Sequence, residues 1–198
     1  MLLAAGASPI MADDPSESAE ITALAQGLTL NLGTPSGSRV EAMLRSGAEA
    51  NRRGIPVVFD PVGAGCSGFR RNSAGEILRR VRLTAIRGNL SEISYLAGFE
   101  SRENGVDSSE TRITAAEAAQ TAAKKLGCVC AVTGERDVIS DGSRTVTILS
   151  GTPLLKKVTG AGCMTSALCA AMCTAADGFV GAAAGIALMD ICGELARE

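Results

Sequence analysis

The sequence predicts an α/β protein in which helices cover both faces of a mostly parallel sheet. Short apolar runs alternate with helical patterns at least four times along the 198 residues, which indicates right-handed βαβ crossovers. Apolar residues make up 46% of the chain but aromatic residues only 3%, so small aliphatic side chains must fill the core. The length suits one domain, which we take as residues 1–198.

The first half of the chain alternates strand and helix signals. Asp14, Pro15 and Glu17 resemble the N-cap, first residue and capping-box partner of a helix, and Ser73 with Glu76 suggests a later cap. In chain order we expect a strand end over 7–12, a helix to about residue 26, a strand over 28–32 and a helix over 38–53 stopped by Gly54. There follow a strand over 55–60, the helix capped by Ser73, a strand over 83–87 and a short helix over 90–96.

The second half continues this alternation. Thr114 and Glu117 form a capping box for a helix that ends at Gly127 after a basic last turn. A buried strand over 128–133, a hairpin of 137–139 and 145–149 and two apolar helices complete the chain. Residues 100–109 are the most polar stretch and predict a surface loop.

The charge balance argues against nucleic acid and membrane as partners. The formal net charge is −2 and no basic stripe stands out. The arginine pairs at 52–53, 70–71 and 79–80 sit near helix ends or turns, where we expect solvated helix faces. The apolar stretch 161–189 is divided at residues 177–178 into runs too short to cross a bilayer.

Cysteine and histidine usage narrows the chemistry. Seven cysteines, mostly in apolar runs and with no secretory signal ahead of them, predict reduced thiols in a cytoplasmic protein. The chain contains no histidine, which argues against a zinc site and excludes a Ser-His-Asp hydrolase. Any general base must then be an Asp, Glu, Cys, Lys or Tyr side chain.

Polar residues follow several strands, at the edge where parallel sheets gather ligands. Asp60 ends an apolar strand, where a carboxylate is costly unless paired or solvated, although it could also be a turn former. Glu92 could hold Mg²⁺ or merely complete a capping box with Asn89, and Arg87 could reach a phosphate. Thr133 could place its hydroxyl against a nucleotide or be an ordinary turn residue.

The most specific signal is the loop TGAGC at residues 159–163, which leads directly into an apolar helix. The amides of Gly160, Ala161 and Gly162, together with the positive end of the helix, favour an anion there. Cys163 falls in the first turn, where the same field favours the thiolate. The loop is not a P-loop, because no Lys-Ser or Lys-Thr follows the second glycine. A glycine turn for close packing is the alternative.

Together these residues predict phosphoryl transfer to a small molecule. This chemistry needs a metal ion to neutralise phosphates, donors for the developing charge and a base in line with the acceptor hydroxyl. Asp60 and Glu92 are the candidate Mg²⁺ ligands, the amides of residues 160–162 are candidates for binding the transferring group, and Cys163 is the candidate for taking the acceptor proton.

Six segments in this order resemble the hydroxyethylthiazole kinase family of thiamine biosynthesis, whose members have a ribokinase-like fold. They are GASPIMA at 6–12, NLGT at 31–34, DPVGAG at 60–65, IRGN at 86–89 with Glu92, TGE at 133–135 and VTGAGC at 158–163. The resemblance runs over essentially the whole chain. It implies a three-layer αβα fold and the phosphorylation of the hydroxyl of 4-methyl-5-(2-hydroxyethyl)thiazole by ATP with Mg²⁺.

The resemblance also implies roles for single residues. Met11 and Gly160 would contact the thiazole, Arg87 and Thr133 would contact ATP, and the two carboxylates would lie near the metal and the phosphates. Cys163 stands where most members of the superfamily carry an aspartate base. The family forms a trimer with its sites between subunits, so we expect a homotrimer here.

The chain departs from the family pattern at both ends. By resemblance it lacks an N-terminal helix, a first strand with an Ile-Thr-Asn element and a C-terminal Gly-Pro-Gly-Ser-Phe segment. We therefore expect an incomplete domain with an exposed sheet edge. Three alternatives stay open. One is a hydroxymethylpyrimidine-type kinase of the same superfamily, against which the opening at residues 6–11 argues. Another is an inactive homologue that binds nucleotide or assembles with full-length subunits. The third is a packed α/β domain that binds no ligand.

Overall fold

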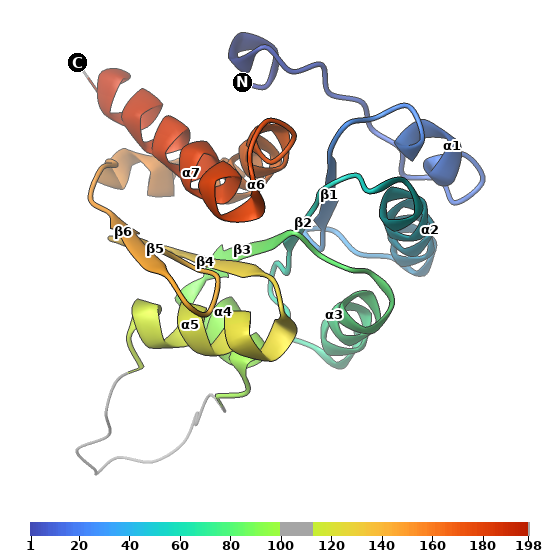
Figure 1. The fold of residues 1–198 in the computed structure, drawn as a ribbon, viewed down its shortest axis with the longest axis horizontal. Coiled ribbons are helices and arrows are strands. Elements are labelled where there is room, and N and C mark those ends of the chain that lie inside the picture. Colours follow the sequence, from blue (N-terminus) through green and yellow to red (C-terminus); the bar gives the residue numbers. More distant parts are fainter. Residues whose placement is uncertain (100–112, 198) are drawn as a thin grey trace.

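Six strands form one central sheet, and helices cover both of its faces (Figure 1). The computed structural model describes residues 1–99 and 113–197. The strands follow one another across the sheet in chain order; β1 to β4 are parallel, and β5 and β6 run antiparallel to their preceding neighbours. The predicted three-layer fold with a mostly parallel sheet is confirmed. The strands are β1 (Leu28–Asn31), β2 (Val57–Asp60), β3 (Ala85–Asn89), β4 (Val129–Thr133), β5 (Asp137–Ser140) and β6 (Thr145–Ile148).

The helices form two unequal layers. One face of the sheet carries α6 and α7, and the other carries α2 to α5, with α1 packed on α2 (Figure 1). The α-helices are α1 (Ser18–Thr22), α2 (Gly37–Arg53), α3 (Gly68–Arg80), α4 (Leu90–Ala97), α5 (Ala115–Leu126), α6 (Ala161–Met172) and α7 (Gly178–Leu195). There are two short 3₁₀ helices in the described chain: η1 (Leu3–Ala5) precedes α1, and η2 (Pro153–Lys157) precedes α6.

Strand β2 shows why the sheet is apolar on both faces. Val57 and Phe59 belong to the core beneath α2 to α5, whereas Val58 belongs to the core beneath α6 and α7. Successive side chains of a strand point to opposite faces, and here both faces are covered, so all three side chains are fully buried. The strand therefore reads as a continuous apolar run that ends in Asp60.

Helix caps confirm several predicted boundaries. Gly54 ends α2 in the left-handed conformation, at a φ of 72°. Thr114 with Glu117 forms the capping box of α5, and Asn89 with Glu92 forms that of α4. The hairpin of β5 and β6 and the two closing apolar helices also match the prediction.

The predicted strand and long helix at the start of the chain are wrong. Residues 7–12 contain no strand, and the only helix between Asp14 and β1 is the five-residue α1. The carboxylate of Asp14 accepts hydrogen bonds from the backbone N and the Oγ of Ser16, at 2.8 and 2.6 Å. The backbone N of Ser18 donates to the carbonyl of Asp14 at 3.0 Å, so Asp14 starts a turn as a cap does, but the regular helix begins only at Ser18.

The predicted start of α3 is also wrong. The N-cap is Ser67, whose Oγ accepts from the backbone N of Arg70 at 3.2 Å. Ser73 lies inside the helix and donates back to the carbonyl of Phe69. A Ser-x-x-Glu spacing occurs by chance within helices, so the pattern alone could not locate the end. The predicted loop at residues 100–109 lies outside the described residues.

Helices α6 and α7 lie unusually close because glycines of α7 face α6. A Cβ on Gly181 would lie 2.7 Å from the Cα of Cys173, and one on Gly185 would lie 2.5 Å from the backbone N of Cys169. By length and composition α7 could cross a membrane, but a core helix has the same composition, and α7 packs against α6 and the sheet. Its apolar character is therefore weak evidence for a membrane span.

Candidate active site

The polar strand ends converge at one edge of the sheet. Because β1 to β4 are parallel, their carboxyl ends lie side by side. Asn31 is the register partner of Asp60 across β1 and β2, and Asn89 is that of Thr133 across β3 and β4. The predicted clustering of these ends is thus a direct result of the topology.

Asp60 is the centre of this cluster and is fully buried, with 0% exposure. Its Oδ2 accepts hydrogen bonds from Asn31 Nδ2 at 3.1 Å and from Ser166 Oγ at 2.7 Å. Its Oδ1 has no hydrogen-bond partner among residues 1–99 and 113–197. A buried carboxylate oxygen without a partner is costly, which makes Asp60 a candidate for contact with a ligand.

The electrostatic environment of Asp60 is mixed. Burial raises the pKa of its carboxyl above the usual value, and the nearby charge of Glu92 raises it further. The guanidinium of Arg87, with Nη1 3.8 Å from Oδ2, and the hydrogen bond from Ser166 act in the opposite direction. A bound cation would favour the ionised carboxylate, so the raised pKa is typical of a functional position.

Arg87 connects β3 to its neighbours. Its Nη2 donates to Thr133 Oγ1 at the end of β4, and its Nε is buried without a partner in the described part of the chain. A Cβ on Gly162 would lie only 2.6 Å from Arg87 Nη1, so α6 rests directly on the guanidinium at this position. The predicted pair of Arg87 and Thr133 is therefore in contact, next to Asp60 and beneath the start of α6.

The loop before α6 leaves the N-terminus of that helix without a side-chain cap. Gly160 is the N-cap at a φ of 88°, and no side chain caps the helix. The amide of Ala161 donates to the carbonyl of Val158 at 3.1 Å, so Gly162 and Cys163 contribute the first amides with no recorded acceptor among the described residues. Uncapped amides at the positive end of a helix favour an anion. The thiol of Cys163 is exposed there.

Glu92 completes the capping box that the sequence suggested and also bonds to the loop that follows Asp60. Its Oε2 accepts from the backbone N of Asn89 at 2.8 Å, which completes the capping box of α4. Its Oε1 accepts from the backbone N of Gly63 at 2.9 Å, in the loop that follows Asp60. Each carboxylate oxygen retains a second lone pair that could accept a further bond.

These residues fit a magnesium ion that is held mainly by its nucleotide. Mg²⁺ usually keeps several waters and takes one or two carboxylates together with substrate phosphates. Asp60 supplies a buried oxygen without a partner, and Glu92 adds a second carboxylate. No group of three or more acidic, Cys or His side chains forms a separate metal cage among the described residues.

Met11 is the one predicted site residue that the structure does not bring to the cluster. Its side chain is 81% exposed, and no recorded hydrogen bond ties residues 10–12 to the strand ends within the described chain. Gly160 is also exposed, at the outer side of the loop. The thiazole contacts predicted for both residues thus lie on an open surface of the single chain.

Three residues of the cluster were not predicted from the sequence. Asn31 and Ser166 hold Asp60, and Arg70 reaches back from α3 to the same edge. The expectation of a solvated helix face is wrong for Arg70, whose side chain is partly buried and donates to three backbone carbonyls. Only Asn31 carried a sequence signal, since it ends an apolar strand as Asp60 does.

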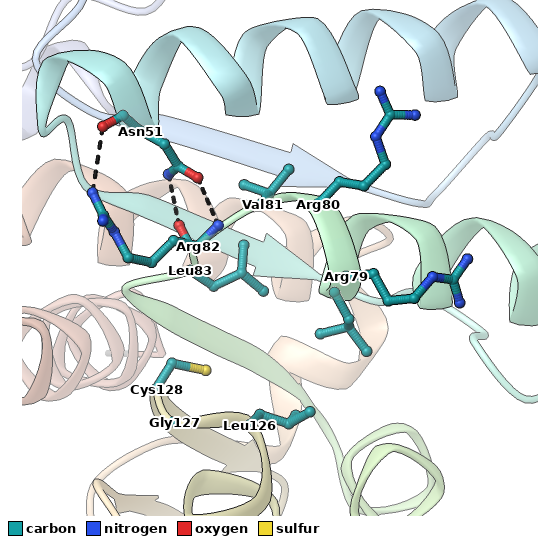
Figure 2. A pocket seen from close by; sticks show the side chains of 10 residues that line it. Asn51, Arg79, Arg80, Val81, Arg82, Leu83, Leu126, Gly127 and Cys128 are labelled. Atoms are coloured by element: carbon teal, nitrogen blue, oxygen red, sulfur yellow. Dashed lines mark hydrogen bonds between the residues drawn. The ribbon is translucent and has the colours of Figure 1, made fainter.

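Two cavities of about 350 and 340 Å³ lie away from the strand-end cluster. They share residues at the amino ends of the strands, on the edge opposite the cluster. Figure 2 shows Asn51 and Arg82 joined by hydrogen bonds along one wall of the first cavity, with Cys128 on the other side. The guanidinium of Arg80 pairs with Glu76 at 2.8 Å. These cavities are therefore separate from the candidate active site.

The fold and the strand-end cluster define the class of protein, which is a kinase for a small molecule. The sequence profile of the Hydroxyethylthiazole kinase family matches residues 1–198. A hydroxyethylthiazole kinase from Ruminiclostridium cellulolyticum is 51% identical over 200 residues, which are 99% of this chain and 73% of that protein. The chain belongs to the hydroxyethylthiazole kinase family, whose members use ATP.

Solved structures agree with this assignment. The structure of a hydroxyethylthiazole kinase protein from Pyrococcus horikoshii OT3 matches with a TM-score of 0.83 at 36% identity, covering 93% of this chain and 68% of that one. Ribokinase from Thermotoga maritima matches with a TM-score of 0.54 at 16% identity, covering 88% of this chain and 52% of that one. The second likeness shows the ribokinase-like fold alone.

Proposed function

We propose that this chain phosphorylates the hydroxyl of 4-methyl-5-(2-hydroxyethyl)thiazole with ATP. The observation that carries the proposal is the buried carboxylate of Asp60, with its unpartnered oxygen, beside Arg87 and beneath the open start of α6. A negative group, a positive group and free amides within one cluster suit a reaction that moves charge between phosphate oxygens.

Each group of residues in the cluster has its own proposed role in the reaction. Asp60 and Glu92 would hold Mg²⁺, which neutralises charge on the phosphates when bound. Arg87 and Thr133 would contact ATP, and their mutual hydrogen bond keeps both side chains at the site. The amides at the start of α6 would stabilise the transferring phosphoryl group as its charge is redistributed.

Cys163 would act at the acceptor. The thiazole hydroxyl oxygen forms a bond to the γ-phosphorus while the bond from that phosphorus to the ADP oxygen breaks. The hydroxyl proton passes to the sulfur of Cys163, which is exposed in the first turn of α6. With no histidine in the chain, the sulfur of Cys163 at the start of α6 is the candidate base.

The thiazole would bind between Met11 and Gly160 in a homotrimer. In the single chain both residues are exposed, as are the apolar side chains of Ile10 at 62% and Val158 at 50%. Apolar side chains on both proposed substrate-binding segments support a site that is completed by a neighbouring subunit. Seven free cysteines support a reducing, cytoplasmic location.

Steady-state release of ADP tests the proposal. Purified chain with Mg-ATP should turn over with the thiazole alcohol and much more slowly with 4-amino-5-hydroxymethyl-2-methylpyrimidine. Faster phosphorylation of the pyrimidine would assign the chain to the other kinase type. A thermal shift with Mg-ATP but no alcohol-dependent ADP release would identify an inactive nucleotide-binding homologue.

A further inference from the structure

Arg70 occupies an unusual position for a surface helix residue. It lies in the first turn of α3, and its side chain runs back between the loops that leave β1 and β2. Nη1 donates to the carbonyl of Val62 at 2.5 Å and to that of Leu32, and Nη2 donates to the carbonyl of Gly33 at 3.0 Å. One guanidinium thus joins two separate loops.

The contacts require an arginine. Among the described residues no carboxylate lies within 4.0 Å of Arg70, so its charge is balanced by carbonyl dipoles alone. A planar fork with donors on two nitrogens can reach carbonyls on both sides at once, whereas a lysine ammonium is a single point. The neighbouring Arg71 makes a simpler contact, one bond from Nη1 to the carbonyl of Gly65 at 2.9 Å.

Both loops that Arg70 joins continue directly from residues of the cluster. Leu32 follows Asn31, whose side chain bonds to Asp60, and the backbone N of Leu32 donates to the carbonyl of Asp60 at 3.0 Å. Val62 lies two residues after Asp60. A shift of either loop would therefore move the carboxylate of Asp60 or its partner.

The loop after β2 is held from two sides. Gly63 adopts a φ of 63°, and a Cβ there would lie 3.5 Å from the Cδ of Arg70, so the arginine stem lines this turn. On the other side Glu92 accepts from the Gly63 amide at 2.9 Å. Arg70 and Glu92 together fix the turn between the two carboxylates of the site.

We propose that Arg70 is a positioning residue for phosphoryl transfer: its guanidinium locks the exits of β1 and β2 and so sets the Asp60 carboxylate relative to Glu92. This inference rests on the proposed kinase function. Arg70 acts through the backbone and touches neither substrate. We call the bonds of Arg70 to these two loops the clamp. Misplacement of a reacting group by about 1 Å can lower the rate by on the order of 100-fold, so weakening the clamp should act chiefly on kcat.

The test compares Arg70→Lys with Arg71→Lys. Both changes keep the charge, but only the first removes the fork that spans the two loops. We expect Arg70→Lys to lower kcat by roughly 10- to 100-fold with less than about a threefold change in the KM for ATP, and Arg71→Lys to match the parent. Added methylguanidinium should partly restore the turnover of Arg70→Ala and leave that of Arg71→Ala unchanged.

Hydrogen exchange gives a readout that does not depend on turnover. The amides of Gly33 and Gly63 are bonded to Asn31 Oδ1 and Glu92 Oε1, at 2.7 and 2.9 Å, so both should be protected in the parent. Arg70→Lys should accelerate exchange in peptides covering these glycines, while circular dichroism and the remaining peptides stay unchanged.

The outcomes separate the inference from the proposed function. Parent-like kcat and exchange in Arg70→Lys would overturn the clamp, as would equal effects of the two lysine variants. A lower melting temperature with unchanged kcat would assign Arg70 a purely structural role and also overturn it. A parent chain without turnover on either alcohol would contradict the proposed function, and unchanged exchange at Gly33 and Gly63 would then still refute the clamp.

Discussion

At the scale of single residues, the site depends on how one buried carboxylate is held. Asp60 accepts two hydrogen bonds on Oδ2 and none on Oδ1 in the described chain. The bond from Ser166 lowers the pKa of Asp60 against the effect of burial. Ser166 thus favours the ionised carboxylate, which the proposed binding of Mg²⁺ by Asp60 would require.

Ser166→Ala should move the acid limb of the kcat/KM profile to higher pH. Without the Ser166 hydroxyl the pKa of Asp60 rises further, so a larger fraction is protonated at low pH. Loss of activity should therefore be greater near pH 6 than near pH 8. Thr165→Ala is the control, since within residues 1–99 and 113–197 that hydroxyl bonds only to the carbonyl of Ala161. An identical loss at every pH would argue against this role.

Cys163→Ser should lower kcat by about 100-fold and leave the KM for ATP nearly unchanged, because the base acts on the acceptor alone. Iodoacetamide labelling followed by mass spectrometry offers a second check. Cys66 and Cys192 are exposed like Cys163 and serve as internal controls. Bound thiazole alcohol should protect only Cys163, and an equal loss of kcat and ATP affinity would contradict the assignment.

Sequence patterns predict the candidate site residues better than the residues that hold them in place. Asp60, Arg87 and Thr133 could be grouped in advance because parallel strands end at one edge. Ser166 depends on the rotation of α6 about its axis, which its almost uniformly apolar sequence does not reveal. Arg70 belongs to a basic pair, and such pairs normally lie in solvent.

At the scale of elements, the seam between α6 and α7 depends on residues without side chains. Gly185→Ala should destabilise the protein by about 1–3 kcal/mol, because the added Cβ would meet the backbone of Cys169 and force the helices apart. Gly75→Ala in α3 is the control. It meets only the flexible end of Arg79 and should be neutral or stabilising by up to about 1 kcal/mol. Urea unfolding measures both, and equal effects would refute the close packing.

A pair of acidic residues links β5 to α7. Burial, followed by the hydrogen bond and charge of Asp137, raises the pKa of Asp190 to about 7, and Glu194 adds to the effect while Ser150 opposes it. Asp137 also accepts from the Gly134 amide at 2.7 Å, directly after the end of β4. The two carboxyls can share a proton only while one of them is protonated.

The contribution of Asp190 to the stability of the protein should therefore fall as pH rises toward neutrality. The folded pKa of Asp190 exceeds the value of about 4 in an unfolded chain, so the folded state holds the proton more tightly. This contribution is complete below about pH 4 and is lost as pH rises through about 7. Melting temperatures across this range should decline less steeply in Asp190→Asn. A parent-like slope in that variant would exclude the pair as the cause.

The ends of helices were predictable where the sequence offers a single capping residue or capping box. Gly54 and the capping box of Thr114 with Glu117 lie where the sequence suggested. The cap of α3 was misplaced because Ser67 and Ser73 both offer a hydroxyl, and packing rather than local chemistry selects between them. Asp14 bonds to Ser16 as a cap does, but the helix that follows covers only Ser18–Thr22, so the error lies in the predicted length of that helix.

At the scale of the whole molecule, the proposed trimer would bring Met11 of one subunit to Cys163 of another. The 20.1 kDa chain should then elute as a species of about 60 kDa in light-scattering chromatography. Equal amounts of the inactive variants Met11→Asp and Cys163→Ala should regain activity when mixed. In a randomly mixed trimer, about a quarter of the sites combine an intact Met11 from one subunit with an intact Cys163 from its neighbour. No recovery after subunit exchange would mean that both residues belong to one chain.

The architecture as a whole was predictable because its signals repeat. Four strand-to-helix alternations and small aliphatic side chains required a covered parallel sheet. The layer assignment was not predictable, since α6 and α7 are apolar nearly all round and do not indicate which face they cover. Tertiary contacts decide that choice.

The strand order also bears on the tendency of the protein to aggregate through the edges of its sheet. β1 and β6 form the two borders of the described sheet, and each contains only four residues. A border strand carries unpaired main-chain groups that could recruit another chain and begin an aggregate. Four residues provide few such groups, so each border is a weak template for fibre growth. This favours association through side-chain surfaces, and hence closed assemblies over filaments.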